Sequence, residues 1–465
     1  MSETINSSVK QEFAKIVGKE NFFDSELDKL TYSYDGSFEP LLPAHKPELI
    51  LKVKETRQVS AIMALANKHG VPVVPRGAAT NRSGGTMPMA GGIVLCLDGM
   101  DRILEVDDSN LTVTVEPGVR TIDLYNHCAA QGLFFPPDPA SWKYSTIGGN
   151  IVENAGGPRA VKYGVTGDYV MGLEVVLADG RVLNTGGKMI KNVTGYDITS
   201  LMVGSEGTLG IVTKAILKLL PLPKYKKTIQ VMFGSLEDAC QTVKESILSG
   251  TIPATAEIMD KISLQAVAKL RNLTIDPQIE ACIIFDLDGD NQAALDEQSV
   301  VLEKIAKKNN VREFRVAPTP EAAEELWAIR RGLGPAVATM APNKIGEDIS
   351  VPRSELPEIA RRVRAIAAKY ELKIAFFGHA GDGNVHPSIL TDMSIPSEAE
   401  KVHKAVGELF AAAIELGGTL SGEHGIGISK KPYIYSALGE VGIDVLRQVK
   451  QAMDPKGILN PGKIF

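Results

Sequence analysis

The sequence predicts an α+β protein of about two domains. Three observations support this fold class: two glycine-dense segments beside short β-type runs, helical and strand patterns that alternate along the chain, and a change of pattern near residue 227. With 465 residues, the chain is long enough for about two domains with ample hydrophobic cores. Its apolar share of 44% and charged share of 23% are ordinary for a globular protein.

In the N-terminal half, residues 1–41 are expected to be helical and then irregular. A helix is expected from Thr56, which we predict as its cap, to Gly70, because Val59, Ile62, Met63 and Ala66 share one helical face. Another helix should run from about 121 to 132, and Asp179–Gly180 is a hairpin turn signal. Strands are expected at 48–54, 71–74, 93–97, 103–106 and 111–115.

Pro221 and Pro223 mark a linker to a second region. Strand patterns at 228–233, 281–287, 374–377 and 385–390 alternate there with helical runs. This pattern predicts an α+β domain on a mostly antiparallel sheet.

Charge, apolar runs and cysteines exclude several classes. A net charge of −6 without a dominant basic tract argues against a nucleic-acid partner. No run approaches the ~18 apolar residues of a membrane helix, and the first 20 residues lack a secretory signal, so we expect a cytoplasmic protein without a transmembrane segment. Cys96, Cys128, Cys240 and Cys282 are too scattered for a cluster or disulfide framework, and we predict that they are buried or incidental.

The segment Val71–Leu97 is rich in glycine between two β-type runs. Glycine adopts positive φ angles without steric cost, so such a loop can direct several backbone N–H groups at one anion. An ordinary surface loop is the alternative. A second glycine-dense block at 146–157 favours a long ligand with a diphosphate at its centre. Neither block fits the GxGxxG or GxxxxGK[ST] fingerprints, so direct NAD or ATP binding is not expected.

The pattern PRGxxTxxSGG, followed by PPDP and IGGNIxxNAGG, resembles the PCMH-type FAD-binding domain of the vanillyl-alcohol-oxidase family. The resemblance implies such a domain at 42–221, after an N-terminal segment at 1–41. The loop contains no histidine, so FAD should be bound non-covalently. Carried over by motif, the FAD-binding residues are Pro75, Arg76, Gly77, Ala78, Ala79, Thr80, Asn81, Ser83, Gly84, Pro139, Thr146, Gly149, Asn150, Asn154, Gly156, Gly157, Glu206, Gly207, Gly210, Ile211 and Asn460.

Two histidine-containing motifs lie in the C-terminal half. His379 and His386 frame GHAGDGNVH, whose turn residues could bring both imidazoles to one end of a strand pair, where they would suit a divalent ion. A purely structural histidine pair is the alternative. SGEHGIG, which starts at Ser421, adds the carboxylate of Glu423 and a candidate base, His424.

Together these motifs resemble the C-terminal domain of FAD-linked 2-hydroxyacid dehydrogenases, the family of the glycolate oxidase flavin subunit and D-lactate dehydrogenase. The resemblance implies an FAD-linked oxidase C-terminal α+β cap domain at 222–420 and a segment at 421–465 that returns to the flavin. His379, His386 and Glu423 would bind one divalent ion (Zn, Mn or Fe), and His424 would be the catalytic base.

Arg330 lies in WAIRR, which resembles the family's WxxR helix, and would anchor the substrate carboxylate. A solvated helix face is the alternative. Gly334 stands where relatives that oxidise larger diacids carry a polar residue, which favours a small 2-hydroxy acid, D-lactate first and glycolate second.

The electron acceptor would be an electron-transferring flavoprotein or an iron–sulfur subunit, as in lactate dehydrogenase–electron-transferring flavoprotein complexes. Two alternatives stay open at this point, an oxidase that uses oxygen and a cofactor-binding subunit without chemistry of its own.

Overall fold

The computed structural model describes residues 5–40, 42 and 45–465. Its contacts divide the chain into two compact units. The first unit contains the chain up to Ala155, Val165–Leu222 and Glu423–Phe465, and the second contains Gly156–Gly164 and Pro223–Gly422. The N-terminal helices thus share a unit with the C-terminal segment, and the domain limits expected at 41, 221 and 420 stay predictions.

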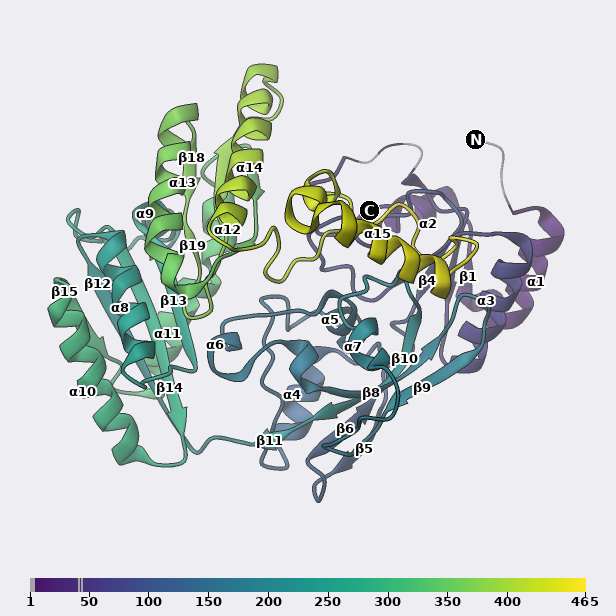
Figure 1. Ribbon diagram of the computed structural model, residues 1–465, viewed down its shortest axis with the longest axis horizontal. Helices are drawn as coiled ribbons and strands as arrows, with labels where there is room; N and C mark the ends of the chain where they lie inside the picture. Colours follow the sequence, from purple (N-terminus) through teal and green to yellow (C-terminus); the bar gives the residue numbers. More distant parts are fainter. Residues whose placement is uncertain (1–4, 41, 43–44) are drawn as a thin grey trace. The chain divides into compact units, whose positions relative to one another are not determined.

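The first unit contains a four-stranded sheet and a five-stranded sheet (Figure 1). The four-stranded sheet has the order β1-β2-β4-β3, in which β4 runs parallel to both β2 and β3. The five-stranded sheet has the order β5-β6-β10-β8-β9 and is antiparallel throughout. The strands of this unit are β1 (Phe22–Phe23), β2 (Leu49–Lys52), β3 (Val73–Arg76), β4 (Ile93–Cys96), β5 (Ile103–Asp107), β6 (Thr112–Val115), β7 (Leu133–Phe134), β8 (Val170–Val176), β9 (Val182–Gly186), β10 (Ile211–Lys218) and β11 (Leu220–Pro221).

The helix α3 covers the four-stranded sheet with the face that its apolar spacing predicts, since Val59, Ile62, Met63 and Ala66 are all buried in one core with β2 and β4. Thr56 does not cap it. Glu55 occupies the N-cap position, and the Thr56 hydroxyl donates to the Glu174 carboxylate at 2.6 Å instead. The helices of the first unit are α1 (Ser7–Val17), α2 (Glu26–Thr31), α3 (Thr56–His69), α4 (Thr121–Ala129), α5 (Ile147–Glu153), α7 (Ile198–Met202) and α15 (Ile434–Met453), with 3-10 turns η1 (Lys19–Asn21), η3 (Thr166–Tyr169) and η5 (Lys431–Tyr433).

The C-terminal segment joins the first unit by strand-like contacts. Val73 donates its N–H to the Ile458 carbonyl, and Asn460 donates to the Val73 carbonyl, both at 2.8 Å. Ile458 and Leu459 are buried in the same core as α3. These contacts bring Asn460 close to the loop that follows β3.

The second unit is built on a seven-stranded antiparallel sheet, as the sequence predicts, in the order β15-β12-β14-β13-β19-β20-β17. A three-stranded sheet, β16-β21-β18, lies beside it in this unit. Its strands are β12 (Tyr225–Phe233), β13 (Thr255–Asp260), β14 (Ala281–Gly289), β15 (Val311–Val316), β16 (Asn343–Gly346), β17 (Ile349–Ser350), β18 (Lys373–Ala375), β19 (Phe377–His379), β20 (Asn384–Val385) and β21 (Ser388–Thr391). Its helices are α6 (Ala160–Tyr163), α8 (Leu236–Leu248), α9 (Lys261–Arg271), α10 (Gln292–Lys308), α11 (Pro320–Arg331), α12 (Leu333–Ala338), α13 (Leu356–Tyr370) and α14 (Pro396–Glu415), with the 3-10 turn η4 (Arg353–Glu355).

The strands expected at 374–377 and 385–390 are each divided in two. β18 and β21 belong to the three-stranded sheet, whereas β19 and β20 belong to the seven-stranded one. Pro387 separates β20 from β21, and because proline has no N–H it cannot donate to a strand ladder. The division matters for the site, because His379 ends β19 and His386 lies where the chain leaves β20 for β21 of the other sheet.

All four cysteines are free and buried, as expected. Across the part of the chain that the structure describes, no helix combines the length and the apolar composition of a membrane span.

Candidate functional site: a cavity with a carboxyl pair, and a histidine pair

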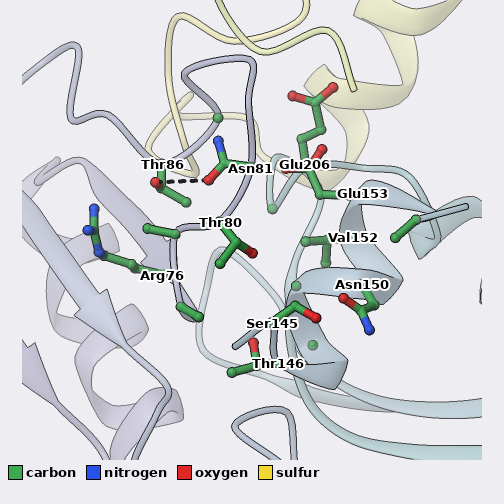
Figure 2. Close-up of a pocket in the computed structure, with 18 of the residues that line it drawn as sticks. Arg76, Thr80, Asn81, Thr86, Ser145, Thr146, Asn150, Val152, Glu153 and Glu206 are labelled. Atoms are coloured by element: carbon green, nitrogen blue, oxygen red, sulfur yellow. Dashed lines mark hydrogen bonds between the residues drawn. The ribbon is translucent and has the colours of Figure 1, made fainter. Parts of the chain in front are cut away.

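A cavity of about 340 Å³ lies within the first unit, between the loop after β3 and the helix α5 (Figure 2). Most of the residues expected to bind FAD line it. The expected residues at the cavity are Pro75, Arg76, Gly77, Ala78, Ala79, Thr80, Asn81, Pro139, Thr146, Gly149, Asn150, Glu206, Gly207, Gly210 and Ile211, and Glu423 and His424 line it as well.

The two glycine-dense segments come into close contact at Gly77. A β-carbon at this position would lie 2.3 Å from the Thr146 hydroxyl, so no side chain fits there. The Thr146 hydroxyl itself is buried and has no hydrogen-bond partner among the described residues. A buried polar atom without a partner costs about 1–3 kcal/mol. These observations fit a cavity whose polar lining is completed by a bound FAD.

Six expected FAD-binding residues do not line the cavity. Asn154 ends α5 in the left-handed conformation and accepts from the Gly167 N–H at 2.8 Å. The Ser83 carbonyl accepts from Ile428 and Ser429, and Gly84 lies against Ile428. Gly156 and Gly157 belong to the second unit.

The sixth, Asn460, joins two loops by hydrogen bonds to their backbone. Its side-chain amide donates to the Gly85 carbonyl at 2.9 Å and to the Glu206 carbonyl at 2.7 Å. Lys463, which we did not predict from the sequence, is buried beside it and donates to the Asn460 side-chain oxygen at 3.1 Å. Burial lowers the pKa of Lys463 to about 8.

A pair of carboxyl groups, the buried Glu206 and the partly buried Glu153, lies at the end of the cavity opposite Thr146 (Figure 2). Glu206 accepts the backbone N–H groups of Ile426 and Gly427, one on each oxygen and both at 2.7 Å. A β-carbon on Gly425 would lie 2.3 Å from Glu153 Oε2, so both acids lie against the segment that follows His424.

Burial and the neighbouring Glu206 charge raise the pKa of Glu153 well above its ordinary value. Burial also raises the pKa of Glu206, but the two backbone N–H groups and the Lys463 charge oppose that rise. We therefore assign the proton to Glu153 and the negative charge to Glu206. Sequence analysis missed Glu153, because a single glutamate after a glycine-rich run has no distinctive spacing.

The histidine pair lies in the second unit. His379 ends β19, His386 follows β20, and these two strands pair antiparallel, so the rings approach to 5.1 Å between centroids. Glu257 on β13 stands directly opposite His379 in the sheet. Its Oε1 lies 2.6 Å from His379 Nδ1.

Arg330, at the end of α11, lies at the same carboxylate. Its Nε and Nη2 contact Glu257 Oε2 at 2.7 and 2.6 Å, and its guanidinium lies 5.5 Å from the centre of the Phe377 ring. Burial by itself would raise the pKa of Glu257, but the charges and hydrogen bonds of His379 and Arg330 bring it below its ordinary value. Arg330 is therefore largely buried beside the histidine pair and is not part of a solvated helix face.

Asp348 organises the other side of the histidine pair. It accepts from the Asn384 amide at 2.6 Å, from the Ser421 hydroxyl at 2.8 Å and from the Gly422 N–H at 2.9 Å. Its Oδ1 lies 3.7 Å from His386 Nδ1. Glu423 is the next residue after Gly422 and begins the last segment of the first unit.

Comparisons with known proteins show the family of the chain. Residues 222–464 match the family model for FAD linked oxidases, C-terminal domain, and residues 47–186 match the model for an FAD binding domain. A glycolate oxidase subunit GlcD of Bacillus subtilis (strain 168) is 45% identical over 99% of this chain and 97% of its own length. A D-lactate dehydrogenase of Anaerostipes hadrus is 35% identical over 90% of each chain.

Among solved structures, p-cresol methylhydroxylase with substrate bound matches 98% of this chain and 96% of its own with a TM-score of 0.80 at 19% identity. The 4-ethylphenol oxidase of Gulosibacter chungangensis matches 100% of this chain and 97% of its own, also with a TM-score of 0.80, at 22% identity. These two likenesses concern the fold alone. The protein belongs to the FAD-linked oxidases and is an FAD-dependent oxidoreductase.

Proposed function

We propose that the protein is a dehydrogenase that oxidises a small D-2-hydroxy acid, D-lactate first and glycolate second, to the 2-oxo acid. The observation that carries the proposal is that Glu423 and His424 line the same cavity as the residues expected to hold FAD. The names of two relatives, a glycolate oxidase subunit and a D-lactate dehydrogenase, support this substrate class.

His424 is proposed as the base that removes the proton from the substrate hydroxyl. Neutral imidazole is suited to this task at working pH. Its Nε2 lies 3.8 Å from the Glu423 carboxylate, so a carboxylate is near the imidazole when it gains the proton. Bound FAD would accept the hydride from the substrate Cα, which is the redox chemistry that the cofactor supplies.

Arg330 is proposed to bind the substrate carboxylate, because a guanidinium offers a planar pair of donors to a carboxylate. A small acid suits the surroundings. Gly334, four positions after Arg330, has no side chain to bind a second substrate carboxylate.

His379, His386 and Glu423 are proposed to hold one divalent ion, since two imidazoles and a carboxylate suit zinc, manganese or iron(II). Such an ion would lower the pKa of the substrate hydroxyl and orient the acid. The histidine pair fits this role on chemical grounds, because Glu257 and Asp348 stand behind the two rings as carboxylates commonly stand behind metal-binding histidines.

The electrons are proposed to pass to a separate protein, an electron-transferring flavoprotein or an iron–sulfur subunit. The four buried cysteines are too far apart in sequence to suggest a second redox centre in this chain. An oxidase that uses oxygen stays the second candidate, since one relative is named a glycolate oxidase subunit.

The test is the rate at which D-lactate bleaches the flavin under anaerobic conditions. His424→Ala should slow this step by about 10²–10⁴-fold, the usual contribution of a general base, while the flavin content stays unchanged. His127→Ala, an exposed histidine on α4, is the matched control and should behave as wild type. Equal bleaching rates in all three proteins would refute the proposed role of His424.

A further inference from the structure

One buried carboxylate, Glu257, contacts both an expected metal ligand and the expected substrate anchor. Its side chain is fully buried. Oε2 accepts two N–H bonds from Arg330, and Oε1 faces the Nδ1 atom of His379 at 2.6 Å. The two oxygens thus serve different partners within one unit of the protein.

The chemistry of these partners decides where the proton on His379 lies. An ionised carboxylate can only accept hydrogen bonds, so Nδ1 of His379 must carry the proton and donate it. A neutral imidazole with a proton on Nδ1 keeps its lone pair on Nε2. Nε2 is therefore the nitrogen that His379 can offer to a metal ion.

The pairing of strands in the sheet explains why the Glu257 side chain lies next to His379. Glu257 on β13 and His379 on β19 are directly opposed residues of neighbouring antiparallel strands. Opposed side chains in such a pair have β-carbons about 4.5–5.5 Å apart, within reach of each other. His386 is held differently, because its Nδ1 lies 3.7 Å from Asp348, longer than a hydrogen bond.

We propose that Glu257 is a positioning residue that keeps His379 protonated on Nδ1, presents Nε2 as the metal ligand, and holds Arg330 beside the same ring. The proposal rests on the proposed function, because it takes His379 as a metal ligand. It adds that the metal ligand and the substrate anchor depend on one carboxylate.

Glu257→Gln tests the proposal because it keeps the shape and reverses one hydrogen bond. Arg330 has donors only, so the glutamine oxygen must face Arg330 and the glutamine NH₂ must face His379. Nδ1 would then have to accept, which moves the proton to Nε2 and blocks metal binding there. We expect a 10–100-fold loss of metal affinity, the usual effect of removing such a carboxylate partner.

The control is Asp286→Asn, on β14 next to β13. Asp286 is also a buried carboxylate in this sheet, and it bonds Trp327 of α11, the helix that carries Arg330. It makes none of the contacts described for His379. The control should keep the metal affinity of wild type, which would separate the role of Glu257 from a general disturbance of the sheet or of α11.

Two measurements are made on purified full-length protein with FAD bound. Titration of the metal-depleted protein with Zn²⁺ gives the affinity, and ¹⁵N NMR of histidine-labelled protein without metal gives the tautomer, with His379→Gln to assign the signal. We expect His379 protonated on Nδ1 in wild type and on Nε2 in Glu257→Gln.

The outcomes separate this proposal from the function on which it rests. Failure of wild type to bind any divalent ion would overturn the proposed metal site. Metal binding by wild type, with equal affinity in Glu257→Gln, would overturn the role of Glu257 alone. If the variant does not fold, the wild-type spectrum still decides, because a His379 protonated on Nε2 contradicts the proposal.

Discussion

Replacement of Glu206 by glutamine should weaken both the fold and the catalytic step, because Glu206 holds the segment that follows His424. The carboxylate receives the N–H groups of Ile426 and Gly427 at 2.7 Å, one on each oxygen. A glutamine can accept only one of them. Its NH₂ group would face the other N–H, donor against donor, in a buried place.

The magnitude follows from the bond that is lost. A buried N–H without a partner costs about 1–3 kcal/mol, so the free energy of unfolding of Glu206→Gln should fall by about that amount. Any shift of the segment also displaces His424, and a displacement of ~1 Å in an active site can cost about 100-fold in rate. Flavin bleaching by D-lactate should slow accordingly, at equal flavin content.

Glu153→Gln is the matched variant. Burial and the Glu206 charge raise the pKa of Glu153 well above its ordinary value, which favours the neutral acid, and glutamine resembles a neutral glutamic acid in shape. We expect its bleaching rate to stay close to that of wild type, and its stability to match that of wild type below about pH 4.5, where Glu153 is protonated in the folded and the unfolded state. An acid whose pKa is raised by folding gives stability that is complete below its unfolded value and is lost as the pH rises through the folded pKa. The Glu153→Gln protein should therefore lose less stability than wild type between about pH 4.5 and alkaline pH.

Urea unfolding at several pH values and anaerobic stopped-flow bleaching measure both effects. The reasoning is refuted if Glu206→Gln keeps the stability and the rate of wild type. If Glu153→Gln is instead as damaging as Glu206→Gln at pH 7, the assignment of the proton to Glu153 is wrong.

Three further predictions concern the cofactor, the substrate anchor and the acceptor. Acid precipitation should release all flavin into the supernatant, because the loop after β3 contains no histidine for a covalent link; flavin in the pellet would contradict this. Arg330→Lys should lower kcat/KM for D-lactate by about 10–100-fold, since a charge-assisted bond contributes about 1.5–3 kcal/mol, whereas Arg331→Lys, which pairs with Glu324 near the surface, should have little effect. Finally, D-lactate should reduce the flavin once and turnover should then stop in aerated buffer until an artificial dye is added, and rapid steady formation of hydrogen peroxide would instead identify an oxidase.

Local sequence patterns predicted helices and strands correctly where the residues that are buried in the structure are those that the apolar spacing marks. The apolar face of α3 and the hairpin between β8 and β9 both follow directly from spacing and turn residues. The helix α5 was not expected, because Gly148 and Gly149 are poor helix formers. The structure explains why a glycine stands at position 148, since a β-carbon there would lie 2.6 Å from the side chain of Pro117. The close approach of Pro117 is a tertiary contact, so no local pattern reveals it.

The residues of the candidate site also fall into those that local sequence patterns predict and those that only tertiary contacts reveal. Motif residues such as Gly77, Thr146 and His424 could be placed from the sequence because neighbouring residues in the chain define them. Glu153, Glu257 and Asp348 could not, because each is defined by partners 36 or more positions away, such as His379 at 122 positions from Glu257 and Asn384 at 36 positions from Asp348.

Glu257 and Asp348 are buried among groups that fix their hydrogen bonds, and Glu153 is partly buried beside Gly425. No local sequence pattern reveals such residues. They still affect the structure strongly, because a buried carboxylate determines which neighbouring atoms must donate hydrogen bonds. The motifs thus identify the groups that we expect to meet the cofactor and the substrate. Glu257 is proposed to determine which nitrogen of His379 carries the proton, and Glu206 holds the segment after His424.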